Sequence, residues 1–299
     1  LGDVYKRQAP DNTPGNKTLF SKSVARTLLA KIYAEKPLRD YTKVIQYCDE
    51  VKADGFDLVD DFSDLFGMNA AGTDAKMRNT KESILEAQFT SGAGNWCTWM
   101  FGRDLVNWNN NFTWAKWVTP SRDLISAFKQ EGDEVRFKES IVYYDCNWSN
   151  YYPSDNYPFM YKCRSANSSI IKYRYADVLL LKAEALIMQD TPDLEGAADI
   201  IDEVRDRAKL GALPTSVRSN KNVLLNALLK ERRLELAFEG QRWFDLVRLD
   251  KVEEVMNAVY SKDSGRKAQI YTFDKNSYRL PIPQSVIDAN DKIHQNPGY

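Results

Sequence analysis

The sequence predicts an all-α fold in which pairs of short antiparallel helices are interrupted by one long, irregular, loop-rich segment. Apolar residues recur at helical spacing in two consecutive runs within residues 22–53, 174–210 and 222–260. Alanines lie on the stripes where the two runs of a pair would touch, and a proline or glycine stands between or just after the runs. We therefore expect three helical hairpins, together with strands that are few and short.

The first hairpin is expected to comprise residues 22–35 and 40–53. Pro37 ends the first helix, and Gly55 lies just past the second. The predicted inward positions are Val24, Leu28, Leu29 and Ile32 in the first helix and Tyr41, Val44, Ile45, Cys48 and Val51 in the second.

The second hairpin is expected at residues 175–189 and 194–209, and the third at residues 222–238 and 242–260 with a break at Gly240. Helix pairs of this size with small residues at their contact are typical of tetratricopeptide repeats. Such repeats bury their core only by stacking on their neighbours, so the hairpins should pack against one another.

A long excursion, about residues 66–170, separates the first hairpin from the second. One helix is expected inside it, at residues 121–131, where Thr119-Pro120 would supply the cap and the first residue. Thr191-Pro192 is expected to open the helix at 194–209 in the same way. An insertion of this length in a compact domain usually carries function.

The two ends of the chain differ from the repeat region. Residues 1–8 show no clear pattern and residues 9–16 are turn-rich, so residues 1–16 are expected to be a truncation edge or scar followed by a linker. Residues 17–299 are expected to form a single domain. Its tail, residues 271–299, should be extended, with a short strand or hairpin between Tyr271 and Pro283.

Six of the seven tryptophans fall inside the excursion, among Gly, Asn, Ser and Thr. Aromatic rings beside amides on polar loops suit a carbohydrate, although a hydrophobic minicore under the excursion is the structural alternative. The favoured ligand platforms are Trp96, Trp99, Trp114 and Trp117, the further candidates are Trp108, Trp148, Tyr151 and Tyr152, and the expected polar partners are Asn95, Asn107, Asn109 and Arg103.

Composition argues against several classes of function. The formal net charge is −1 and no stretch is strongly basic, so a nucleic-acid partner is not expected. No run of about 20 apolar residues could span a bilayer. The only histidine is His294, which argues against a catalytic triad. The chain has four cysteines, which lack the spacing of a zinc site: Cys48, Cys97, Cys146 and Cys163. In an exported protein, Cys97 could form a disulfide with Cys146. We expect no catalytic residue, metal or cofactor.

Residues 231–248 alternate charged groups with large apolar ones. The residues expected to form a structural motif there are Glu231, Arg232, Glu235, Glu239, Arg242, Trp243, Asp245 and Arg248. Arginine–carboxylate pairs could lock two helices across Gly240, with Trp243 in the core. Paired carboxylates for acid–base catalysis are the alternative. The structural interpretation is favoured, because each acid has an arginine within one helical turn, which stabilises the charged carboxylate.

Four stretches resemble the SusD/RagB family of nutrient-binding outer-membrane lipoproteins of Bacteroidetes. Residues 231–248 (ERRLELAFEGQRWFDLVR) are similar to the family's most specific motif. Residues 174–186 (RYADVLLLKAEAL) and 204–208 (VRDRA) resemble two of its helices, and 281–284 (PIPQ) with 295–299 (QNPGY) resemble its C-terminal signature. The order of these stretches makes the resemblance specific.

The resemblance implies a tetratricopeptide-repeat scaffold, a ligand-binding irregular region and no catalysis. It also implies an oligosaccharide or other nutrient as the ligand, a SusC-like TonB-dependent transporter as the partner, and a position on the outer-membrane surface. The lipid anchor would lie in an N-terminal region that this chain lacks. A glycoside hydrolase with aromatic subsites, or a repeat scaffold that binds peptides on its concave face, are the alternative functions.

Overall fold

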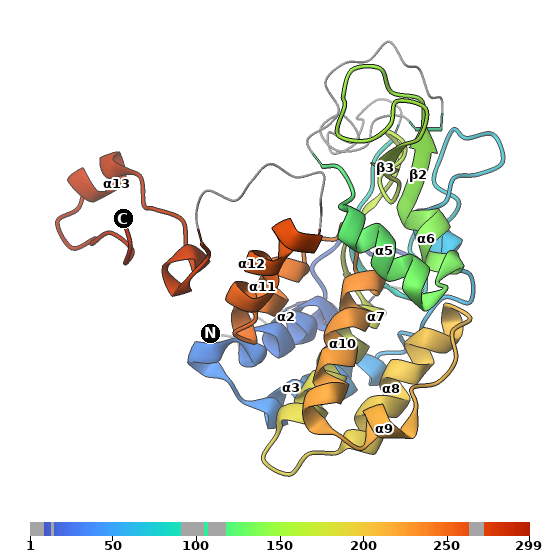
Figure 1. Ribbon diagram of the computed structural model, residues 1–299. Helices are drawn as coiled ribbons and strands as arrows, with labels where there is room; N and C mark the ends of the chain where they lie inside the picture. The colour runs from blue at the N-terminus through green and yellow to red at the C-terminus, as the bar shows by residue number, and fades with distance from the viewer. Residues whose placement is uncertain (1–8, 13–14, 91–104, 107–117, 263–271) are drawn as a thin grey trace. The chain divides into compact units, whose positions relative to one another are not determined.

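The structure is a computed structural model that describes residues 9–12, 15–90, 105–106, 118–262 and 272–299 (Figure 1). These residues fall into two compact units, Leu1–Gln241 and Arg242–Tyr299. Helices dominate both units. Within the described residues, strands are limited to two antiparallel pairs in the first unit. The predicted all-α fold with few short strands is confirmed.

The first hairpin consists of α2 (Lys22–Ala34), the 3₁₀ turn η1 (Lys36–Leu38) and α3 (Tyr41–Ala53), as predicted. Ser21 and Asp40 cap the two helices by accepting backbone N–H bonds through their side chains. Arg26 on α2 joins the helices, since its guanidinium lies 2.9 Å from Glu50 on α3 and 2.6 Å from Asp54 just after it.

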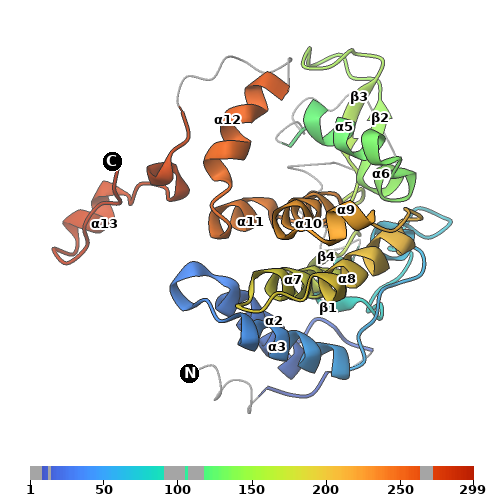
Figure 2. The same ribbon diagram turned by 60° about the horizontal axis from the view of Figure 1, so that its bottom comes forward.

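The second hairpin, α7 (Tyr175–Met188) and α8 (Leu194–Arg207), packs between the first hairpin and α10 (Lys221–Glu235), which follows the short helix α9 (Thr215–Arg218). Figure 2 shows α7 and α8 between these layers. The helix at 194–207 was predicted, but its cap was not: Asp193 accepts from the Gly196 N–H, so the cap lies downstream of Thr191-Pro192. Alanines such as Ala183 and Ala198 are fully buried here.

A two-stranded sheet closes the excursion where it leaves and rejoins the scaffold. Strand β1 (Ser83–Ala87) pairs antiparallel with β4 (Ile170–Arg174), and β4 runs directly into α7. The two ends of the excursion are therefore hydrogen-bonded to each other, although they are far apart in the sequence.

A short helix, α4 (Ser63–Phe66), precedes β1, and the excursion carries a helix–hairpin arm after β1. The arm contains α5 (Arg122–Glu131), α6 (Glu134–Ser140) and the hairpin of β2 (Ile141–Tyr144) with β3 (Tyr157–Met160) (Figure 1). Helix α5 was predicted, but its cap is Ser121, one residue after the Thr119-Pro120 pair. Gly132 ends α5 in the left-handed conformation with φ 68°.

The third predicted hairpin differs from expectation. Helix α10 stops at Glu235 rather than at Phe238, and the following turn includes Phe238 and Gly240 with positive φ. The expected helix at 242–260 is two helices in the second unit, α11 (Arg242–Arg248) and α12 (Val252–Lys262), because Asp250 adopts a left-handed φ of 56° between them.

The tail of the second unit contains the 3₁₀ turn η3 (Lys275–Tyr278) and the short helix α13 (Gln284–Asp288). The strand predicted between Tyr271 and Pro283 is wrong for the residues that the structure describes there. Asp274 and Ser277 form a reciprocal capping box, and this local bonding favours a helical turn over an extended strand.

Helix α10 offers a test of this packing. Replacing the fully buried Leu228 by Ala should lower the free energy of unfolding by about 2–5 kcal/mol, because it leaves a cavity in the core between α7, α8 and α10. Val223 on the same helix is 42% exposed, and Val223→Ala should change stability by no more than about 0.5 kcal/mol. Urea denaturation measures the free energy of unfolding of both variants. Equal losses of stability in the two would contradict the packing described.

Candidate functional site

An open hollow lies at the tip of the β2–β3 hairpin. Its volume is about 800 Å³. The described residues that line it are Arg122, Asn147, Trp148, Ser149, Asn150, Tyr151, Tyr152, Pro153 and Ser154. Three aromatic rings, three amide or hydroxyl side chains of the Asn147–Asn150 segment and one guanidinium thus meet on one concave surface. Such a surface combines flat apolar faces with hydrogen-bonding groups.

Arg122 fixes the tyrosines of this hollow. Its guanidinium carbon lies 4.5 Å from the ring centre of Tyr151 and 4.2 Å from that of Tyr152. The same guanidinium donates a hydrogen bond to the Tyr151 carbonyl, and the Tyr152 hydroxyl donates to the Pro120 carbonyl at 2.7 Å. Because Arg122 is the first residue of α5, these contacts hold the tip of the hairpin on a helix.

Trp148 is held from behind by a small aromatic cluster. Its ring centre lies 6.0 Å from those of both Tyr157 and Phe159 on β3, and these two rings are buried. Trp148, Tyr151 and Tyr152 are themselves only partly buried. Both interpretations of the aromatic residues therefore apply here: one side of each ring belongs to a minicore, and each ring also lines the hollow.

The structure thus brings together three of the predicted ligand-contacting residues, Trp148, Tyr151 and Tyr152. The others lie outside the described residues and stay predictions: Trp96, Trp99, Trp108, Trp114, Trp117, Asn95, Asn107, Asn109 and Arg103. Sequence reasoning missed Arg122, Asn147 and Asn150. The run Asn147–Ser154 (NWSNYYPS), polar and aromatic between two strand-like segments, is the signal that could have found the two asparagines.

A buried ion network lies at the root of the arm, centred on Glu235 at the end of α10. Its carboxylate contacts Arg174 at 2.5 Å, Arg136 at 3.0 Å and also Arg207. Glu82, just before β1, bridges Arg174 and Arg207 at 2.7 Å each. All five side chains are at most 4% exposed. The network joins α6, β4, α8 and α10 at one point.

Glu239 extends this network in the turn after α10. It accepts from Arg174 Nε at 2.7 Å and from Lys162 Nζ at 2.6 Å, and Lys162 also donates to the Glu235 carbonyl. Burial, opposed by Glu239, lowers the pKa of Lys162 to about 8. Phe62 closes one side, with its ring centre 4.9 Å from the Arg207 guanidinium carbon.

A second buried carboxylate, that of Asp177, links α10 to the first and second hairpins. Asp177 on α7 accepts from Lys31 of α2 at 2.6 Å and from Arg232 of α10 at 2.8 Å. Burial alone would raise the pKa of Asp177, but Lys31 and Arg232 outweigh it and hold the pKa well below its usual value. These two contacts tie the three helical layers together.

The acids of the charged stretch 231–248 that precede Gly240 have a mainly structural environment, and the predicted pairing across Gly240 stays a prediction. Glu231 pairs with Arg136, and Glu235 and Glu239 pair with arginines of other elements rather than with those one turn away. Asp245 and Arg248, 2.7 Å apart, form a pair inside the stretch. Trp243 is only partly buried and therefore does not reach the expected core position; it is the second residue of the short helix α11.

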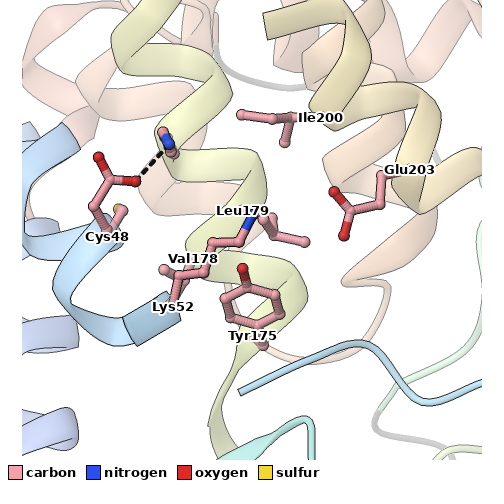
Figure 3. A pocket seen from close by; sticks show the side chains of 9 residues that line it. Cys48, Lys52, Tyr175, Val178, Leu179, Ile200 and Glu203 are labelled. Carbon is pink, nitrogen blue, oxygen red and sulfur yellow. Dashed lines mark hydrogen bonds and ion pairs between the residues drawn. The ribbon is translucent and has the colours of Figure 1, made fainter. Parts of the chain in front are cut away.

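A small cavity of about 30 Å³ between α3, α7 and α8 has room for one water-sized molecule (Figure 3). Figure 3 shows Cys48, Tyr175 and Glu203 around it. Asp49 and Lys182 also line the cavity and form an ion pair at 2.5 Å. Burial raises the pKa of the Cys48 thiol and of Tyr175, so both stay protonated. Cys48, Cys146 and Cys163 are buried, whereas Cys97 lies outside the described residues.

Within the described ranges, no group of His, Cys, Asp and Glu side chains has the arrangement of a metal site. In the same part of the chain, none of the helices combines the length and the apolar character needed to cross a membrane.

Removing the central carboxylate should destabilise the fold severely. Glu235→Gln leaves the buried guanidinium groups of Arg136, Arg174 and Arg207 undercompensated, so the free energy of unfolding should fall by about 3–5 kcal/mol. Asp60, which is 96% exposed beside Lys81, provides the control. Asp60→Asn should leave the urea midpoint unchanged, and an equally stable Glu235→Gln variant would refute the importance of the network.

The buried carboxylates of this network predict that the stability of the fold falls in acid. Burial tends to raise the pKa of Glu235 and Glu239, but their arginine partners hold both pKa values below the usual one, so the folded state binds protons more weakly than the unfolded state. Stability should be full above the ordinary glutamate pKa of about 4.3 and fall as pH drops below it. Burial raises the pKa of Glu231, which offsets part of this effect.

Urea denaturation between pH 7 and pH 3 measures this dependence. Glu235→Gln should show a shallower loss of stability with acid than the parent chain. A parent chain whose stability rises as pH falls from 4 to 3 would contradict the assigned directions.

Comparison with known proteins agrees with the fold and the motifs. Residues 154–299 match the model of the SusD family. Two proteins of Formosa agariphila are similar in sequence: SusD-like protein P38 is 43% identical over 99 residues, and SusD-like protein P2 is 36% identical over 143 residues. These alignments cover 31% and 46% of this chain, but only 19% and 27% of the two relatives.

Solved structures share the fold over most of the chain. A SusD-like protein from Bacteroides fragilis superposes with a TM-score of 0.73 at 21% identity, covering 100% of this chain and 69% of that one. A laminarin-binding SusD-like protein superposes with a TM-score of 0.71 at 24% identity, covering 100% of this chain and 67% of that one. Surface glycan-binding protein A from Bacteroides uniformis superposes with a TM-score of 0.68 at 20% identity, covering 94% of this chain and 62% of that one. Residues 154–299, just under half of the chain, are therefore similar in sequence to the SusD family, and the chain shares the fold of SusD-like proteins.

Proposed function

We propose that this chain binds oligosaccharides at the hollow of the β2–β3 hairpin. The observation that carries the proposal is the joint presence of Trp148, Tyr151 and Tyr152 in a hollow that also contains Arg122 and Asn147. An aromatic face shields the C–H face of a pyranose, and the amide and guanidinium groups bond its hydroxyls. The match to the SusD family model and the glycan-binding proteins among its structural relatives support this assignment.

The expected affinity is modest. Burying about 60 Å² of apolar surface on one ring contributes roughly 1.5 kcal/mol. Two or three rings and a few hydrogen bonds of about 1 kcal/mol each predict dissociation constants from millimolar to micromolar. Such affinities permit capture followed by release to a second protein.

We further propose that the captured sugar is delivered to a SusC-like TonB-dependent transporter. The protein would act at the outer surface of the outer membrane, held by a lipid anchor. The match to the SusD family model supports this assignment. The excursion residues outside the described part of the chain remain proposed platforms, with Trp96, Trp99, Trp114 and Trp117 the first to test.

Binding without catalysis is the favoured activity. A glycoside hydrolase needs two carboxyl groups on either side of the scissile bond, roughly 5 to 10 Å apart. The described lining of the hollow holds three aromatic rings, amides, hydroxyls and one arginine, which suits recognition. Measurement of reducing ends after incubation with oligosaccharides distinguishes a hydrolase from a binding protein. Binding that survives deletion of the excursion would instead favour a peptide- or ligand-binding face on the repeat helices.

Ligand binding can be tested by affinity gel electrophoresis with laminarin, xylan, mannan and amylopectin, followed by calorimetry with the polysaccharide that retards the chain. Trp148→Ala and Tyr151→Ala should each weaken binding by roughly tenfold or more, since one platform is worth about 1.5 kcal/mol. Asn147→Ala, at an exposed position of the same hollow, should weaken it without a loss of stability.

Tyr33 on α2 gives the matched control, because it is a partly buried tyrosine stacked on Tyr47 and away from the hollow. Tyr33→Ala should bind as the parent does. If Trp148, Tyr151 and Asn147 can each be replaced with unchanged affinity, this hollow is not the site.

A further inference from the structure

A second hollow lies at the base of the arm, on residues that have no part in the site proposed above. Its volume is about 510 Å³. Glu139, Tyr161 and Arg164 form one wall, and the turn at 67–72 forms much of the other, together with Ser63, Val106 and Lys76. The ammonium group of Lys76 is already paired with Asp61 and Asp64. Tyr161 directly follows β3, and Glu139 lies in α6 just before β2, so the hairpin connects the two hollows.

Arg164 and Glu139 form a buried pair with unused hydrogen-bonding capacity. Arg164 Nη2 donates to Glu139 Oε2 at 2.7 Å and to the Glu139 carbonyl, and Arg164 Nε donates to the Tyr161 carbonyl. Among the described residues, Arg164 Nη1 and Glu139 Oε1 have no hydrogen-bond partner, and neither atom is sealed from solvent. One donor and one acceptor of this ion pair therefore remain available to a ligand.

Tyr161 adds an aromatic ring beside this pair. The guanidinium carbon of Arg164 lies 3.6 Å from its ring centre, which fixes both groups. The ring is partly buried against the cluster around Tyr157 and Phe159 and also lines the hollow. A ring held in one orientation loses little conformational entropy when a ligand packs on it.

The opposite wall leaves room for a ligand. The turn is held by Asn69, whose Oδ1 accepts from the Thr73 N–H at 2.9 Å. Ala70 and Ala71 are exposed beside it, and their small side chains leave space in the hollow for a ligand. The wall is set by hydrogen bonds within the turn, so ligand binding would not need to order it.

We propose that this second hollow is a further carbohydrate subsite, which takes a neutral sugar residue of the same polysaccharide that binds at the hairpin tip. Two hydroxyls of a pyranose match the two remaining atoms of this pair: one hydroxyl accepts from Arg164 Nη1, and the other donates to Glu139 Oε1. The part of the Tyr161 ring that lines the hollow contacts C–H groups of the sugar. The inference rests on the proposed glycan binding, and it adds that a polysaccharide engages the arm at two places, which raises its apparent affinity.

The test compares polymer and short ligand on the intact chain. The probes are the polysaccharide that retards the parent chain in affinity gels and a trisaccharide of the same linkage. Tyr161→Ala and Glu139→Gln should weaken retardation by the polymer roughly fivefold to tenfold, the loss expected for one subsite of a multivalent contact. Ala71→Leu, at an exposed position, should fill the hollow and give the same loss without unfolding the chain. Tyr33→Ala is the control and should bind as the parent.

Outcomes of this comparison separate the two proposals. Retardation that is lost in Tyr151→Ala but unchanged in Tyr161→Ala, Glu139→Gln and Ala71→Leu overturns the second subsite and leaves the first intact. A parent chain that no polysaccharide retards overturns both. Two results together establish the second subsite. All three variants are retarded less by the polymer, and the trisaccharide binds more weakly to the Tyr151→Ala, Ala71→Leu double variant than to Tyr151→Ala alone.

Discussion

The fold depends on one buried carboxylate, that of Glu235, and on the arginines that surround it. Taking several charges out of water costs far more than one ion pair returns, so such a cluster is stable only when every member is paired. Glu235 meets this condition through Arg136, Arg174 and Arg207, and Glu82 completes the pairing of the last two. The geometry of α6, β4, α8 and α10 is thereby coupled, because a shift in one element would leave a charge uncompensated.

This network also explains how an irregular excursion can be held firmly. Arg136 and Lys162 belong to the arm, yet their partners lie on α10 and in the turn after it. The root of the arm is therefore fixed by charge, whereas its tip is held by stacked rings and by Arg122. Two kinds of interaction act at the two ends of the same hairpin, and the aromatic surface is presented on a support that is already ordered.

Periodicity predicted the scaffold well, because helical spacing is a local property. The bounds of α2, α3, α5, α7 and α8 came within a few residues of expectation. The partners of the charged residues were not predictable, since Glu235 and Arg136 are 99 positions apart and only the tertiary fold brings them together. The helix caps at Ser121 and Asp193 were missed because a Thr-Pro pair upstream offered a competing local signal. At the site, the tyrosine pair was anticipated, but Arg122 was not, since its contact with Tyr151 crosses 29 residues.

The pairing of β1 with β4 has a consequence for how this protein can change. The two strands bring the ends of the excursion side by side, so the segment between them is a single closed loop attached to the scaffold. Lengthening or replacing a closed surface loop adds little entropic cost, because the cost grows only with the logarithm of its length. The tip of the arm, away from Arg136 and Lys162 at its root, can accordingly be remodelled while the helical layers keep their sequence, so that selection for a new nutrient need not disturb the buried network.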